Sequence, residues 1–73
     1  MKITKSIINY LINIIDNNGY EFTLISDNEL KVLNKSKEAI NIIVKDNCYI
    51  LEYKEYRERL YKSKDVLDKI ERV

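Results

Sequence analysis

Tyrosine and basic side chains gather in one stretch of this chain, YILEYKEYRERLYKSK at residues 49–64. The stretch holds four of the six tyrosines, five basic side chains and three acidic ones. Aromatic rings can stack on bases and basic groups can contact phosphates, so one hypothesis is a nucleic-acid-binding segment. Its contact residues would be Lys54, Tyr56, Arg57, Arg59, Tyr61 and Lys62. The interleaved acids reduce the net charge of the stretch to +2 (five minus three), which weakens this hypothesis.

Groups that could carry out catalysis are scarce. The chain has no histidine, the commonest general base, and Cys48 is its single cysteine. A zinc site would have to combine Cys48 with carboxylates, which is an unusual ligand set. One glycine is too few for a phosphate-binding glycine-rich loop. We therefore expect no enzyme, no catalytic residue, no metal site and no cofactor.

The composition indicates one small domain spanning residues 1–73. Its net charge of +1 gives no strong field toward DNA or anionic lipid, and its apolar runs are too short for a membrane span. A single cysteine fits a reducing compartment, so we expect a cytoplasmic protein. Isoleucine, asparagine and lysine make up about two-fifths of the chain, and their AT-rich codons indicate a low-GC bacterium or its phage or mobile element. If the gene belongs to a phage, the compartment is the host cytoplasm.

The N-terminal segment has the apolar period of a helix. Its apolar residues cover about half of a helical circumference, and Gly19 follows where a left-handed residue commonly ends a helix. This predicts a helix over about residues 3–18. The apolar arc is wider than one sheet face would cover, so a second helix or a partner should pack on its flank.

After Gly19 the apolar period changes to two, which predicts strands at about 20–26, 29–34, 39–45 and 48–55. Asp46 and Asn47 tolerate the positive φ angles of a tight hairpin. A two-residue loop there pairs Val44 with Tyr49 and Asn41 with Glu52, and this register is consistent along both strands.

The C-terminal part predicts a second helix over about 63–72, with Ser63 as its N-cap and Asp65 in its first turn. Residues 55–62 could be a strand extension, a loop or an early helix. The predicted fold is therefore α+β, in the order α-β-β-β-β-α. We expect an antiparallel four-stranded meander with the helices packed on one face.

Alternation along the strands also predicts which side chains face away from the helices. A small apolar centre surrounded by polar residues is typical of an interaction surface. The candidate protein-binding residues on this open face are Ile25, Leu33, Ile43, Ile50 and Tyr56.

These observations predict a small non-enzymatic interaction protein. We expect it to inhibit or modulate a host macromolecule by stoichiometric binding, as an anti-CRISPR or another anti-defence protein does. The alternatives are a nucleic-acid-binding protein that uses residues 53–64 and a toxin-neutralising immunity protein. The expected partner is another protein or protein complex; a homodimer and nucleic acid are alternatives, and no membrane is expected.

Overall fold

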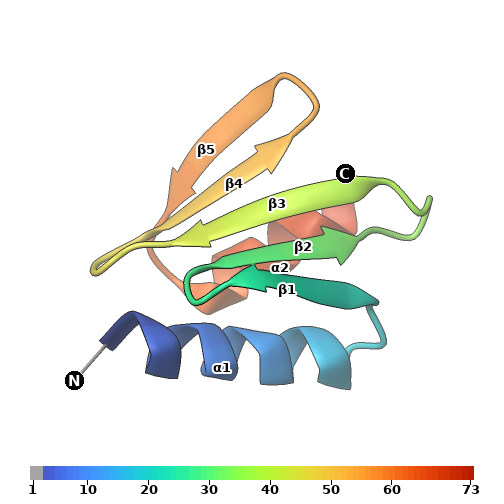
Figure 1. The fold of residues 1–73 in the computed structure, drawn as a ribbon. Coiled ribbons are helices and arrows are strands. Elements are labelled where there is room, and N and C mark those ends of the chain that lie inside the picture. Colours follow the sequence, from blue (N-terminus) through green and yellow to red (C-terminus); the bar gives the residue numbers. More distant parts are fainter. Residues whose placement is uncertain (1–2) are drawn as a thin grey trace.

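The computed structural model describes residues 3–73, which form a helix, five strands and a second helix. The helices are α1 (Ile3–Asn17) and α2 (Ser63–Arg72), and the strands are β1 (Phe22–Ser26), β2 (Glu29–Leu33), β3 (Ala39–Val44), β4 (Tyr49–Tyr53) and β5 (Tyr56–Leu60). The strands form one antiparallel sheet in chain order, and both helices pack on the same face (Figure 1). The expected order of helix, antiparallel strands and helix is confirmed, but the sheet has five strands rather than four.

The helix α1 ends where its sequence indicates. Gly19 has a φ of 82° and its N–H donates to the Asp16 carbonyl at 3.0 Å, so the chain leaves the helix through a left-handed residue. Ile8, Leu11 and Ile15 point into the core and are almost fully buried. α1 also contacts α2, which accounts for the width of its apolar arc.

Alternate residues of the strands supply the other side of the core. In the middle of the sheet Leu30, Ile42 and Leu51 stand in one cross-strand row and are fully buried. The register of the β3–β4 hairpin is confirmed, with Val44 opposite Tyr49 and Asn41 opposite Glu52. This one-sided burial follows from the period of two, because successive side chains of a strand point to opposite faces.

The fifth strand is the main departure from the expected fold. The predicted strand over 48–55 ends at Tyr53, and a turn at Lys54 and Glu55 brings β5 back along β4, with Tyr53 opposite Tyr56. Lys54 has a φ of 56°, a conformation that usually calls for glycine or asparagine. The turn contains neither, nor aspartate or proline, so no ordinary turn signal marked it.

Neither helix, in the part of the chain described, is long and apolar enough to cross a membrane. The helix α2 covers the predicted residues 63–72, but the predicted N-cap is wrong, because Ser63 is the first helical residue and Lys62 occupies the N-cap position. The Lys62 side chain makes no capping hydrogen bond. Asp65 lies in the first turn, where a negative charge is favourable.

Candidate functional site

The open face of the sheet carries the predicted apolar centre, but that centre is largely covered. Ile43 and Ile50 stand opposite each other, with Glu29 on one side of the pair and Arg59 on the other. Ile50 is only 6% exposed, and Ile43 is half-buried. Neighbouring polar side chains therefore leave little apolar surface on this face for a partner.

The other open-face candidates do not extend this centre. Leu33 is half-buried at the far end of β2, opposite Ala39. Ile25 is 49% exposed, but it lies in the irregular part of the edge strand β1 between Leu24 and Ser26. The structure thus separates Ile25 and Leu33 from the Ile43–Ile50 pair.

The predicted position of Tyr56 on the open face is wrong. The turn at Lys54 and Glu55 reverses the chain, so Tyr56 comes to lie opposite Tyr53 on the helix-covered side. Its hydroxyl donates to Glu58 and accepts from Lys69 of α2 at 3.2 Å. Lys69 also forms an ion pair with Glu58 at 3.0 Å. The Tyr56 hydroxyl and then Lys69 lower the pKa of Glu58, so this cluster ties β5 to α2.

The six residues of the nucleic-acid hypothesis do not form one strip. Arg57 and Arg59 lie on the open face, while Lys54 stands at the hairpin tip and Tyr61 and Lys62 at the opposite end of β5. Acids within the fold also offset two of the cations. Arg57 pairs with Glu52 at 3.3 Å and Lys54 pairs with Glu38 at 2.9 Å. An extended basic path for a nucleic-acid backbone is therefore not assembled from these residues.

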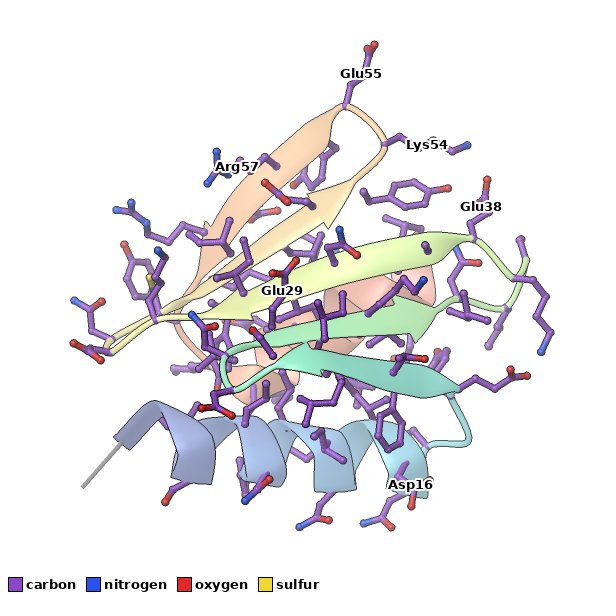
Figure 2. The ribbon with its side chains drawn as sticks, in the orientation of Figure 1. Asp16, Glu29, Glu38, Lys54, Glu55 and Arg57 are labelled. Atoms are coloured by element: carbon purple, nitrogen blue, oxygen red, sulfur yellow. The ribbon has the colours of Figure 1, made fainter. Side chains whose placement is uncertain are left out.

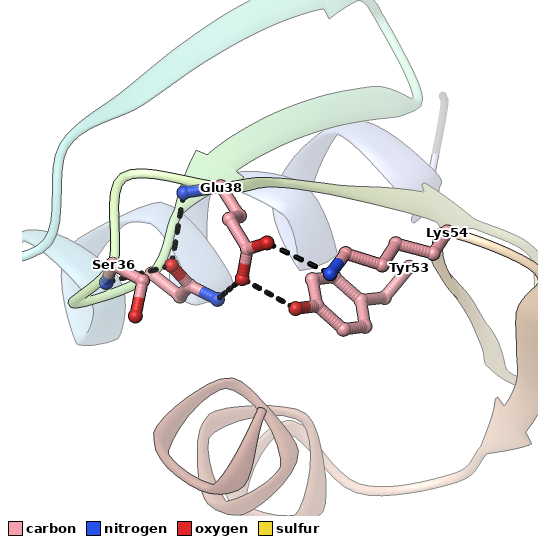
Figure 3. A network of polar contacts seen from close by, with 5 residues as sticks. Ser36, Glu38, Tyr53 and Lys54 are labelled. Carbon is pink, nitrogen blue, oxygen red and sulfur yellow. Dashed lines mark hydrogen bonds and ion pairs between the residues drawn. The ribbon is translucent and has the colours of Figure 1, made fainter.

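Glu38 is the centre of a polar network that joins two turns of the sheet (Figure 3). The Tyr53 hydroxyl donates to its carboxylate at 2.5 Å, and the Asn34 amide donates to it at 3.4 Å. The buried Asn34 side chain in turn accepts the N–H groups of Ser36 and Glu38, each at 2.9 Å. The Tyr53 hydroxyl, followed by Lys54 and Asn34, lowers the pKa of Glu38 from 4.5 to about 2. These contacts join the two turns, so we call the network the Glu38 clamp. A carboxylate held in its charged form is a weak base, which suits a structural role.

A polar hollow of about 380 Å³ opens beside this clamp, where the β4–β5 hairpin diverges from β3. Figure 2 shows Glu55 at the hairpin tip, pointing away from the molecule, with Arg57 on β5 below it. The hollow is lined by Ala39, Asn41, Glu52, Lys54, Glu55, Tyr56 and Arg57. Three of its four charged side chains are already in ion pairs, Arg57 with Glu52 and Lys54 with Glu38, so little of its charge is available to a ligand.

The exposed aromatic surface lies at the other end of the sheet. Two adjoining hollows of about 420 and about 210 Å³ share Ile7, Tyr49 and Tyr61 as lining residues. Tyr10 completes the larger hollow and is 59% exposed, and Tyr61 is 65% exposed. We call this surface, formed by Ile7, Tyr10, Tyr49 and Tyr61, the tyrosine groove.

Three parts of the fold position the tyrosine groove. Ile7 and Tyr10 are three residues apart on α1 and so lie on one side of that helix. Tyr49 is buried at the start of β4, where it stands between Val44 and Leu60. Tyr61 lies in the short link between β5 and α2. The remaining lining residues are Ser6, Lys45, Asp46, Asn47, Cys48, Lys62 and Ser63, so a mainly polar rim surrounds an aromatic centre.

Among the residues that line the tyrosine groove and its rim, the sequence predictions named only Tyr61 and Lys62 as binding candidates. Tyr49 appeared there as the partner of Val44, a pairing that is confirmed. The spacing of Ile7 and Tyr10 was the available signal. It could not show that Tyr61 would come to lie next to them.

Cys48, a single thiol, is buried at the edge of the smaller hollow. Within the described part of the chain, histidine, cysteine and acidic side chains do not gather in a group of three or more that could hold a metal ion. Comparison with protein-family models, with curated proteins and with solved structures finds no match for this chain.

Proposed function

We propose that this chain is a non-catalytic protein-binding domain that holds its partner in the tyrosine groove and thereby inhibits or modulates it. The observation that carries the proposal is the pair of exposed rings, Tyr10 and Tyr61, in one hollow with buried Tyr49 and half-buried Ile7. Tyrosine supplies a large contact area at low entropic cost, and it is enriched among the residues that dominate binding energies.

The groove also has the layout of a protein interface. An apolar and aromatic centre loses water on binding, while polar groups at the rim keep contact with solvent. Here the rim includes Lys45, Lys62 and Asp46, all exposed and near the aromatic centre. A partner segment with an apolar or aromatic anchor and an acidic flank would suit these two lysines.

The nucleic-acid alternative has less support. Its aromatic and basic residues are divided between the two faces and the two ends of β5, and Glu38 and Glu52 pair with two of the cations. Binding of a labelled oligonucleotide at low salt, weakening steeply as salt is added, would favour this alternative over the groove.

The test compares matched tyrosine variants of the tagged chain in cells that contain the partner. Wild type should co-purify with one protein at close to equal molar amounts. Tyr10→Ala and Tyr61→Ala should each weaken the purified complex about 30-fold, the effect of losing a dominant interface residue. Isothermal titration calorimetry with the identified partner measures this loss.

Tyr56→Ala is the control, because Tyr56 is also exposed but lies outside the groove, between Glu58 and Lys69. It should leave the affinity unchanged. A complex that survives both groove substitutions, but is lost when Arg57 and Arg59 are replaced by alanine, would move the binding site to the open face and overturn the proposal.

A further inference from the structure

The strand β1 is an unprotected edge of the sheet. β2 is its single neighbouring strand, α1 contacts it as well, and four of its five residues are exposed. Its sequence, Phe-Thr-Leu-Ile-Ser, contains no charged residue and no proline. Leu24 and Ile25 are 51% and 49% exposed. Natural sheets usually guard such edges with charges or proline, because an open edge can pair with another strand.

The opposite edge shows the usual protection. β5 carries Arg57, Glu58 and Arg59 in the middle of its five residues. Each edge strand also contacts one helix, β1 with α1 and β5 with α2, so the two edges differ in their charges. The difference between the two edges makes β1 the one suited to pairing.

The backbone of β1 presents its free hydrogen-bonding groups in a symmetric pattern. The Leu33 N–H donates to the Glu21 carbonyl at 2.9 Å, so residues 21 and 33 form a hydrogen-bonded pair of the ladder. Hydrogen-bonded and non-hydrogen-bonded pairs alternate in an antiparallel ladder. The N–H and C=O groups of Phe22 and Leu24, which lie opposite Val32 and Leu30, therefore point away from β2. Thr23 lies midway between them.

This pattern is complementary to itself. If an identical strand approaches antiparallel, with Thr23 opposite the same threonine of the second copy, Phe22 lies opposite Leu24 of that copy and the reverse also holds. Each of these two positions offers one donor and one acceptor, so the pairing forms about four backbone hydrogen bonds around a twofold axis. Phenylalanine meets leucine on the helix side and threonine meets threonine on the open side, both favourable cross-strand pairs. The irregular part of β1, after Leu24, stays outside the paired unit.

We propose that β1 pairs with β1 of a second copy of this chain about Thr23, which joins two five-stranded sheets into one continuous sheet. A strand of this length buries less than the roughly 1,200 Å² of a stable standard interface, so the dimer is weak and forms at high protein concentration. The tyrosine groove is lined by residues of α1, β4 and the β5–α2 link and by none of β1, so both copies keep it available.

The test uses charges placed at the twofold axis. Sedimentation equilibrium of the wild-type chain, from about 10 μM to about 1 mM, should show the mass rising from 8.7 kDa toward twice that value. Amide exchange at Phe22 and Leu24 should slow over the same range. Thr23→Lys and Thr23→Glu each put like charges opposite each other and should raise the dimer dissociation constant at least 10-fold.

An equal mixture of the two variants should restore the dimer, because lysine then lies opposite glutamate. Circular dichroism must first show that both variants are folded, since Thr23 also lies opposite Lys31 of β2. A wild-type chain that stays monomeric at about 1 mM overturns the proposal. A dimer that neither charge affects also overturns it and would point to another strand as the partner. A mixture of the two variants that stays monomeric overturns it as well. Tyr61→Ala, which tests the tyrosine groove, should leave the dimer intact. Failure of the dimer proposal can therefore be distinguished from failure of the proposed function.

Discussion

At the scale of single residues, the Glu38 clamp predicts an acid-dependent loss of stability. The folded pKa of Glu38 lies at about 2, below its ordinary value of 4.5, because Tyr53, Lys54 and Asn34 all stabilise the charged form. Its contribution is therefore complete above about pH 4.5 and is lost as the pH falls toward about 2. Urea unfolding of the wild type should show the midpoint falling across this window, and Glu38→Gln should flatten that fall.

Tyr53→Phe is the matched control for the same clamp. It removes the largest cause of the shift and keeps the ring, so carboxyl NMR should show the pKa of Glu38 moving up toward 4.5. An unchanged pKa in this variant would show that Lys54 and Asn34 hold the carboxylate without the hydroxyl.

Tyr20 supports a second prediction at this scale. Its ring is buried after the end of α1, and its hydroxyl has no hydrogen-bond partner within the described part of the chain. A buried unpaired polar group costs about 1–3 kcal/mol, so Tyr20→Phe should raise the free energy of unfolding by about 1 kcal/mol. Urea denaturation measures the change, with Tyr53→Phe as the contrasting loss of a bonded hydroxyl. A destabilised Tyr20→Phe would show that this hydroxyl is satisfied in solution.

At the scale of elements, the two hairpins of the second half of the sheet show what a sequence can reveal. The turn at Asp46 and Asn47 has residues that are common in turns, and alternation on both sides agrees with it, so its register could be predicted. The expectation of positive φ angles there is not met, because neither residue adopts one. The turn at Lys54 and Glu55 uses a lysine at positive φ, so nothing local distinguishes it from a continuing strand. That one missed turn removed β5 from the expected fold and placed Tyr56 on the wrong face.

The Lys54 turn should therefore be strained. An L-residue in the left-handed conformation costs roughly 1–2 kcal/mol, which glycine avoids. Lys54 also pairs with Glu38, so replacing Lys54 by glycine in the wild type would remove this ion pair together with the strain. In a Glu38→Gln background, Lys54→Gly should raise the free energy of unfolding by about 1 kcal/mol in urea.

Glu55→Gly is the control, since Glu55 has no positive φ, and it should be neutral or destabilising. Equal effects of the two glycines would show that backbone strain at residue 54 is not the cause.

At the scale of the whole molecule, the tyrosine groove could not be predicted in the way the core was. Alternation along β4 assigns Tyr49 and Leu51 to the helix side, and this pattern can be read from residues that are adjacent in the sequence. The groove instead depends on how α1 docks, since Tyr10 and Tyr61 lie far apart in the chain and meet only at the helix–sheet junction. Docking of this kind is decided by the packing of the entire core, which no local period encodes.

The two-layer arrangement predicts opposite outcomes for neighbouring isoleucines of β3. Ile42 is fully buried under the helices, while Ile43 is half-buried on the open face. Ile42→Ala should cost about 2–5 kcal/mol through lost burial and a cavity, and Ile43→Ala about 1 kcal/mol. A domain of 73 residues has a total stability of roughly 4–11 kcal/mol, so the first change should remove a large share of it and the second only a small one. Thermal and urea unfolding of the two variants, each of which loses the same atoms from the same strand, measure this contrast. Similar losses at both positions would mean that Ile43 is also covered in solution, either by a partner or by a second copy of the chain on the open face.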